Sequence, residues 1–367
     1  MIQNIPQVAK ARELYQKHQR WVPAGFFVLG FMFDTLMLRR IDELMTLLQQ
    51  ALYILISAAL IGLELVESVR EVNPPPVLRK VWRYRDDLLH FMLGTLLNSY
   101  TIFYFKSASA LTSFLFIAFL VALLMMNEFK KFGKSQTQVR MMLLSLSLVS
   151  YLVSLVPIIW GRIGTFPFIV AIILSTLISN GYYRVMIKNL SRQSRLIKTH
   201  LILPFAAVQI LFVLLYFARV IPPVPLAVHY MGIYHNVEKE KDEYKLSYTR
   251  SKWKFWQHGD QTFKTRAGDS VYCFAQVFSP SRFKDELQIR WLYKGEKGNW
   301  LAADAIPLPI TGGREEGFRS VSKKSNFQPG EWRVQIETLD NREIGWIGFV
   351  VENDTSTDVR EFKTELR

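Results

Sequence analysis

The residues best able to do chemistry are acidic side chains and a histidine at the ends of two long apolar segments. They are Glu64, Glu67, Asp86, Asp87 and His90. Asp86 and His90 are four residues apart, so a helix would place them on one face. Carboxylates and an imidazole at one membrane depth can hold a metal ion or relay a proton. The alternative is structural, because acidic residues at a helix N-terminus interact favourably with its dipole.

Asp34 is a second candidate, because it lies within the apolar segment 31–38, FMFDTLML. A carboxylate in the hydrocarbon region is costly and suggests a function by default. Asp34 could take up a proton or pair with a cation. The alternative is a structural contact inside a helical bundle, or an ion pair with Arg39 or Arg40 near the outer surface.

Sequence motifs of known catalytic and metal sites are missing. The chain has no HExxH, CxxC or GxSxG motif and no glycine-rich phosphate loop. Its six histidines are scattered without the spacing of metal ligands. Cys273 is the single cysteine, so no intrachain disulfide can form, and its apolar strand predicts a small buried side chain. The sequence therefore predicts no catalytic site, metal site or cofactor.

Seven apolar segments, each of about the 20 residues that a helix needs to cross a bilayer, position the candidate residues. Their predicted bounds are 22–38, 46–66, 88–106, 111–128, 141–160, 165–182 and 201–220. A preceding amphipathic segment, 6–21, is expected to lie in the membrane interface or to extend the first crossing. The net charge of +14 would suggest nucleic acid in a soluble protein, but here the basic residues lie in the loops between apolar segments. Membrane lipids, not nucleic acids, are the expected partners.

Charge in the connecting loops predicts the orientation. Far more Lys and Arg fall in one set of alternate loops than in the other, and cytoplasmic loops carry this excess. The N-terminus is therefore expected in the cytoplasm, and seven crossings would place the C-terminal part outside. An error of one crossing would move that part to the cytoplasm.

The pattern changes after Pro223 from long apolar segments to short alternating ones. Predicted strands are 226–235, 245–255, 261–265, 270–279, 286–294, 300–306, 317–323, 331–338 and 344–352. Seven to nine short strands separated by turn signals indicate an antiparallel immunoglobulin-like β-sandwich. The expected organisation is thus a helical membrane domain at 1–223, an extracytoplasmic all-β domain at 224–352, and a polar tail at 353–367 that frays.

The β domain is rich in tryptophan and has basic residues nearby. Three residues are predicted to face a ligand, namely Trp291, Arg319 and Trp332. Aromatic platforms beside basic side chains can bind a sugar polymer or an anionic headgroup. The alternative is that the tryptophans belong to the core of the sandwich.

The last hairpin carries a recognisable pattern, which comprises Pro329-Gly330-Glu331-Trp332-Arg333-Val334, Asp340, Gly345 and Phe349-Val350-Val351. This pattern resembles the closing hairpin of a bacterial domain of unknown function, the 2914 type, and 290–293 and 318–322 fit the same resemblance. The helical half is similar to the multi-pass region that precedes this domain in some proteobacterial membrane proteins. The resemblance implies a Gram-negative inner membrane and no particular activity.

Three functions follow from these observations. The first is a non-enzymatic envelope protein whose outer sandwich binds a glycan, a lipid headgroup or a protein partner. The second is a proton-coupled carrier or lipid flippase that uses Asp34 and the cluster from Glu64 to His90. The third is a membrane transferase that acts on a lipid-linked substrate.

Overall fold

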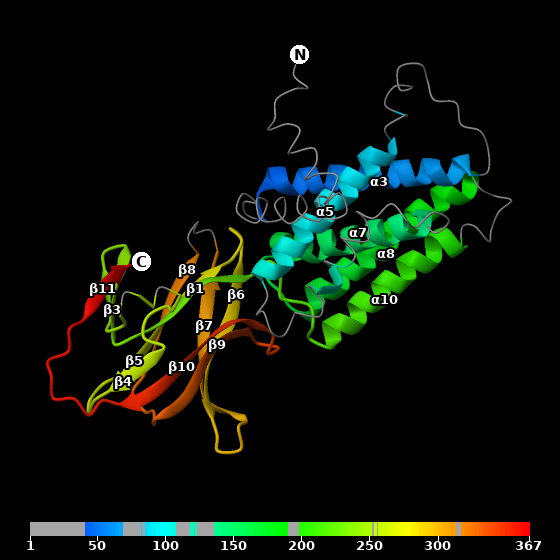
Figure 1. Ribbon diagram of the computed structural model, residues 1–367. Coiled ribbons are helices and arrows are strands. Elements are labelled where there is room, and N and C mark those ends of the chain that lie inside the picture. Colours follow the sequence, from blue (N-terminus) through cyan, green and yellow to red (C-terminus); the bar gives the residue numbers. More distant parts are fainter. Residues whose placement is uncertain are drawn as a thin grey trace, which may run out of the picture. The chain divides into compact units, whose positions relative to one another are not determined.

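The computed structural model describes residues 41–68, 82, 85–107, 118–120, 122, 136–189, 198–251, 253–254, 256–312 and 317–367 (Figure 1). All of them belong to one compact unit of the chain, 41–367. Helices come first and strands follow. This arrangement confirms the predicted order of a helical part and a β-rich part.

Five helices in the described part of the chain are long and apolar enough to cross a membrane. They are α3 (Leu44–Glu67), α5 (Arg85–Lys106), α7 (Gln136–Trp160), α8 (Thr165–Asn189) and α10 (Leu203–Phe217), the last entered through the π-helical turn η2 (Lys198–Ile202). They coincide with five predicted crossings. The predicted crossing at 22–38 lies outside the described residues, and only 118–120 and 122 of the one at 111–128 are described. The total of seven therefore stays a prediction.

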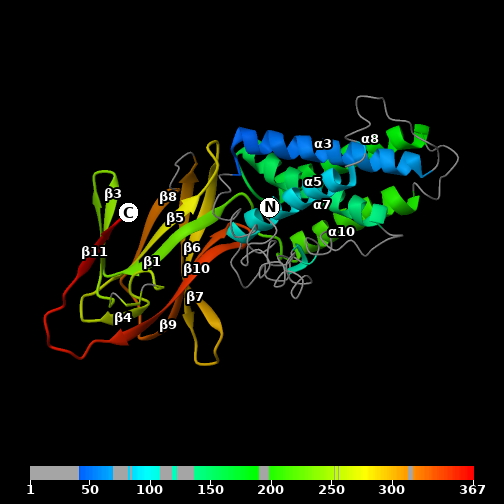
Figure 2. The ribbon, with the colours of Figure 1, turned by 45° about the horizontal axis from the view of Figure 1, so that its top comes forward.

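Helix α7 is central, because it packs against α3, α5, α8 and α10 (Figures 1 and 2). Its sequence suits this position, since small side chains allow neighbouring helices to approach closely. Four serines of α7 are buried, namely Ser145, Ser147, Ser150 and Ser154. The surrounding helices instead expose large apolar side chains such as Leu48, Leu177 and Ile210, as expected of surfaces that face lipid.

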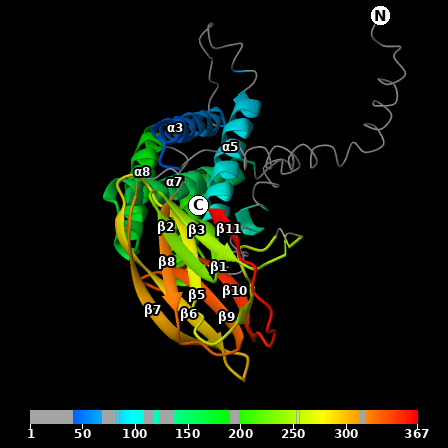
Figure 3. The same cartoon turned by 90° about the vertical axis from the view of Figure 1, so that its left-hand side faces the viewer.

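The described residues of the β-rich part form two larger sheets and one small sheet (Figure 3). One sheet has the order β1-β5-β8, formed by Ala227–Tyr234, Val271–Phe278 and Phe318–Lys324. The other has the order β4-β10-β9-β6-β7, formed by Thr262–Thr265, Glu343–Asn353, Gly330–Thr338, Lys284–Lys294 and Trp300–Thr311. Strands β4 and β10 pair in parallel, and the other pairs are antiparallel.

The two larger sheets share one apolar core and therefore form a β-sandwich. Alternate residues of each strand point into it, including Ile233 of β1, Val277 of β5, Val334 of β9 and Phe349 of β10. Cys273 is 1% exposed in this core, which confirms its prediction as a small buried residue.

Trp291 and Trp332 also lie in the core, so the prediction that they face a ligand is wrong. Their exposed fractions are 0% and 4%. The indole N–H of Trp291 donates to Ser322 Oγ at 2.9 Å, and that of Trp332 donates to the Gln328 carbonyl at 2.8 Å. Both buried donors are satisfied within the protein, which is the usual arrangement of a core tryptophan.

The small sheet has the order β11-β3-β2 and was only partly predicted. Strand β3 (Glu243–Tyr248) pairs with β2 (Asn236–Glu240) and with β11 (Lys363–Leu366). The expectation that the tail frays is therefore wrong for β11. Glu365 explains the attachment, because it accepts hydrogen bonds from the hydroxyls of Tyr230 and Tyr234 on β1.

The α7–α8 hairpin contacts the start of β6 directly. The Gly161 carbonyl accepts a hydrogen bond from the Lys284 amide at 3.0 Å, and the Ile163 amide donates to Asp285 Oδ2 at 2.8 Å. Gly161 has φ +78°, and a Cβ there would lie 2.7 Å from the Arg282 carbonyl oxygen. Glycine is thus required at this approach. These contacts join the sandwich to the helices in addition to the Pro222-Pro223 link.

Candidate functional site

The structure brings Glu64 to a basic partner on another helix. Its Oε2 lies 2.8 Å from Arg140 Nη1, and its Oε1 accepts from Thr137 Oγ1 at 2.5 Å. Arg140 is only 9% exposed. The Glu64 side chain is 25% exposed. The pair ties α3 to α7, since separating it would leave the largely buried Arg140 uncompensated.

Glu67 has its own partners at the start of α5. Its carboxylate pairs with Arg85 at 2.9 Å and accepts from the Trp82 indole at 3.0 Å. His90 is half-buried on α5, and the side chain of Asp87 lies outside the described residues, as does Asp34. The part of the chain that the structure describes contains no group of three metal-ligating side chains. The two glutamates thus take structural ion pairs, not places in one shared site.

Arg319 is half-buried on β8, and its guanidinium donates to the Asp242 carbonyl before β3. It therefore joins the small sheet to the sandwich. With Trp291 and Trp332 in the core, the three predicted ligand-facing residues do not gather at one surface.

A different set of side chains does gather, on the face of the five-stranded sheet that points away from the core. We call it the outer polar face. It consists of Gln288, Arg290, Arg333, Gln335, Glu337, Glu343 and Trp346. Strand register aligns them in rows. Gln335 of β9 lies between Trp346 of β10 and Arg290 of β6, and Glu337 lies between Glu343 and Gln288.

Glu337 lies at the centre of the hydrogen-bond network of this face. It is 1% exposed, yet both of its oxygens have partners. Oε1 accepts from Gln288 Nε2 at 2.6 Å and pairs with Arg290 Nη2 at 2.7 Å, and Oε2 accepts from Gln335 Nε2 at 2.6 Å. The carboxylate therefore fixes the orientation of two amides and one guanidinium.

Arg333 contacts the side chains of the outer polar face that come from β10. It pairs with Glu343, and its guanidinium lies 4.3 Å from the ring centroid of Trp346. Burial lowers the pKa of Arg333 from its usual value, and the nearby Glu343 and Glu337 oppose that shift. Trp346 keeps 42% of its surface exposed. An indole is thus held in place with its apolar surface partly open to solvent.

Several polar atoms of this face are buried and have no partner among the described residues. They are the Nε of Arg290, the Nε of Arg333 and the Oε1 of Glu343. Two arginines and two glutamates also leave the face without net charge. The half-buried amides and guanidinium groups that Glu337 and Glu343 orient beside an exposed indole suit a neutral ligand that is rich in hydroxyl groups.

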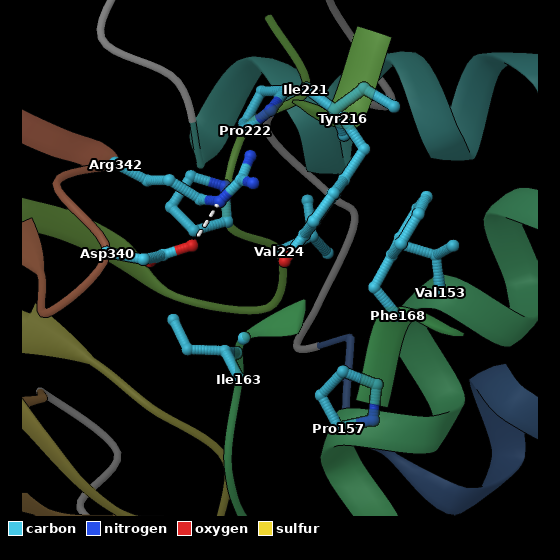
Figure 4. A pocket seen from close by; sticks show the side chains of 12 residues that line it. Val153, Pro157, Ile163, Phe168, Tyr216, Ile221, Pro222, Val224, Asp340 and Arg342 are labelled. Atoms are coloured by element: carbon cyan, nitrogen blue, oxygen red, sulfur yellow. Dashed lines mark hydrogen bonds and ion pairs between the residues drawn. The ribbon is translucent and has the colours of Figure 1, made fainter. Parts of the chain in front are cut away.

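A small pocket lies where the α7–α8 hairpin and the end of α10 meet the turn between β9 and β10 (Figure 4). Arg342 and Asp340 of that turn and Tyr216 of α10 contribute its polar side chains. Its cavity volume of about 30 Å³ has room for a water molecule and not for an enclosed metabolite. An enzyme active site that buries its substrate does not fit here.

The sequence did contain a signal for the outer polar face. Along β9, Trp332, Val334 and Ile336 alternate with Arg333, Gln335 and Glu337. The apolar set must face the core, so the polar set must face outward. The identity of its partners on β6 and β10 depends on strand register, which alternation in a single strand does not provide.

Comparisons with known proteins give one family match. Residues 284–351 match a protein family of unknown function, DUF2914. No curated protein sequence matches the chain. Among solved structures, an immunoglobulin-like protein from Pseudomonas aeruginosa is similar at 12% identity and a TM-score of 0.22, covering 35% of this chain and 98% of its own. The alkylpurine DNA glycosylase AlkC of Pseudomonas fluorescens, bound to DNA, has 9% identity and a TM-score of 0.18, with 85% and 99% covered.

Both TM-scores are too low to support a conclusion about fold or function. The family match is independent of them and agrees with the resemblance of the closing hairpin. Every residue of the outer polar face lies inside the matched segment. Residues 284–351 of this chain therefore match the DUF2914 family of unknown function.

Proposed function

We propose that this protein is a non-enzymatic, multi-pass protein of the bacterial inner membrane whose β-sandwich binds a saccharide of the cell envelope on its outer polar face. In this proposal the N-terminus is cytoplasmic and the sandwich is periplasmic. The helices anchor the sandwich. The contacts of the α7–α8 hairpin with Lys284 and Asp285 hold the sandwich close to the ends of the helices.

The observation that carries the proposal is the exposed indole of Trp346 beside donors and acceptors that are already oriented. A sugar ring can stack its C–H face on an indole while its hydroxyls pair with amide, guanidinium and carboxylate groups. Glu337 fixes those groups before a ligand arrives, which reduces the entropy lost on binding. Because the charges of the outer polar face cancel, an uncharged saccharide is favoured over an anionic headgroup.

Strand order supports an immunoglobulin-like topology for the sandwich. If β1, β5, β6, β8, β9 and β10 are strands A, B, C, E, F and G, the sheets are A-B-E and G-F-C with extra edge strands. Trp291 then occupies the position of the buried strand-C tryptophan. Trp332, bonded to the Gln328 carbonyl, resembles the corner residue near the start of strand F.

Side chains at the sandwich end of the helices support a membrane interface there. Trp160 and Phe166 flank the α7–α8 hairpin, are exposed, and lie with their ring centroids 5.1 Å apart. Aromatic residues are enriched at the level of the lipid headgroups. Together with the excess of basic residues in the opposite loops, this favours a sandwich just outside the membrane.

A carrier or flippase would use the cluster from Glu64 to His90, and a transferase acting on a lipid-linked substrate would need polar side chains that converge on one cavity. Glu64 and Glu67 are engaged in ion pairs instead. We therefore keep the saccharide-binding proposal as the one that the described residues favour.

The test is isothermal titration calorimetry. A panel of neutral oligosaccharides is titrated into the full-length protein in lipid nanodiscs. We expect one panel member to bind, and Trp346→Ala to weaken that binding at least tenfold. The matched control is Trp253→Ala, because Trp253 is also an exposed tryptophan, at 65%, but lies outside the outer polar face. Equal binding by both variants, or no binding of any saccharide, would refute the proposal.

A further inference from the structure

The small pocket at the helix ends contains a cation with an unused hydrogen-bond donor. Arg342 is 8% exposed, and its Nε donates to Asp340 Oδ2 at 2.7 Å. Its guanidinium carbon lies 3.6 Å from the ring centroid of Tyr216 at the end of α10. Its Nη1 is buried and has no partner among the described residues.

The start of helix α8 lines the same pocket, through Gly164 and Phe168. The Phe168 amide donates to the Gly164 carbonyl at 3.3 Å, so the helix begins at this wall. The first amides of a helix lack partners within it, and its dipole favours an anion there. In α8 these are the amides of Thr165 and Phe166, because Pro167 has no N–H and the Phe168 amide is bonded to Gly164. Arg342, whose Nη1 has no hydrogen-bond partner among the described residues, and the start of α8 therefore line one small space.

The other walls of the pocket are apolar. Figure 4 shows Val153, Pro157 and Phe168 on one side and Arg342 and Asp340 on the other, with Val224 between them. The pocket is partly open, and it is too small to enclose a whole phosphate group. It can take one phosphate oxygen while the rest of the group stays at its mouth, beside apolar side chains that suit the carbons of a lipid.

The position of the pocket along the helices indicates that the phosphate belongs to a lipid and is not free phosphate. Pro157 and Tyr216 lie within the last turn of α7 and α10, and Gly164 directly precedes α8. All three helices are long and apolar enough to cross a membrane. Their common end belongs at the depth of the lipid phosphates, where free phosphate would have to compete with a high local concentration of lipid.

We propose that Arg342 and the N-terminus of α8 bind the phosphate of a membrane phospholipid. The Nη1 group of Arg342 donates to a non-bridging oxygen, and the first amides of α8 add the field of the helix dipole. The site is separate from the outer polar face, so its failure would leave the saccharide proposal unaffected.

The experiment is native mass spectrometry of the delipidated full-length protein in detergent. Three probes are compared, which are phosphatidylglycerol, diacylglycerol with the same acyl chains, and inorganic phosphate. We expect wild type to retain one phosphatidylglycerol in preference to diacylglycerol. Arg342→Gln should weaken this retention about tenfold, which matches the loss of one charge-assisted hydrogen bond. Arg342→Lys, which keeps the charge, should retain more lipid than Arg342→Gln.

The matched control is Arg360→Gln, because Arg360 is also a largely buried arginine in an ion pair, 2.7 Å from Asp269, but lies in the segment between β10 and β11 and does not line the pocket. It should retain the lipid as wild type does. Equal retention by Arg342→Gln and wild type would overturn the proposal, as would equal retention of diacylglycerol. Displacement of the lipid by millimolar inorganic phosphate would show a site for free anions and would also overturn it. Circular dichroism of each variant confirms that a loss of lipid is not a loss of fold.

Discussion

Two ion pairs between β6 and β9 offer a direct test of the role of Glu337. The Arg290–Glu337 and Lys294–Glu331 pairs have the same nitrogen–oxygen distance, 2.7 Å. Their exposure differs widely, since the Glu337 side chain is 1% exposed and that of Glu331 is 52% exposed. The burial of Glu337 and its further hydrogen bonds from Gln288 and Gln335 should therefore make its pair contribute more to the stability of the sandwich.

The change is Glu337→Gln, compared with Glu331→Gln. The first leaves Arg290 without its buried carboxylate and presents an amide N–H to two glutamine donors. Breaking a buried pair costs about 3–5 kcal/mol, and we expect about 2–3 kcal/mol because the Arg290 side chain remains 29% exposed. The second change removes an exposed pair and should cost less than about 0.5 kcal/mol.

Urea unfolding of the full-length protein in detergent, followed by tryptophan fluorescence, measures the difference. The free energy of unfolding of the sandwich should fall several times more for Glu337→Gln than for Glu331→Gln, with the slope of the transition unchanged. Equal effects of the two variants would refute the view that Glu337 organises the outer polar face.

Three further predictions follow from buried contacts elsewhere. Glu64→Gln should destabilise the helical part by about 2–3 kcal/mol in thermal unfolding, and adding Arg140→Leu should restore part of that loss, because no buried charge is then left unpaired. Burial lowers the pKa of His235 to about 4, so the unfolded chain binds more protons below about pH 6.5. Stability should therefore fall by at most about 3 kcal/mol from pH 6.5 to 4, and urea midpoints of His235→Phe should depend less on pH. Deleting 363–367 removes the acceptor of Tyr230 and Tyr234, and limited proteolysis should then cut near β3 faster.

The sequence predicted the parts of this fold that depend on local pattern. Apolar segments of bilayer length marked five described helices, and alternation marked the strands of both large sheets. Trp332 shows that residue type alone is a poor guide to position. Its type suggested a ligand-facing side chain, but its alternation in step with Val334 and Ile336 indicated the core. The alternation within the strand was the stronger physical signal.

Contacts between distant parts of the chain could not be predicted. Strands β2 and β11 are short and rich in charge, and they form only because β3 lies between them. The pairing of Glu64 with Arg140 and the stacking of Arg342 on Tyr216 join residues far apart in the chain. Neither spacing nor composition determines which of many charged residues will meet, because tertiary packing decides it.

Photo-crosslinking from Val350 tests the saccharide proposal most directly. Val350 lies on β10 on the same side as Trp346 and is 37% exposed, so Val350→benzoylphenylalanine places a reactive group beside the outer polar face and keeps its indole. Crosslinking in living cells should give an adduct that a glycosidase removes. An adduct that resists glycosidases and is itself a protein would contradict the proposal and identify the partner.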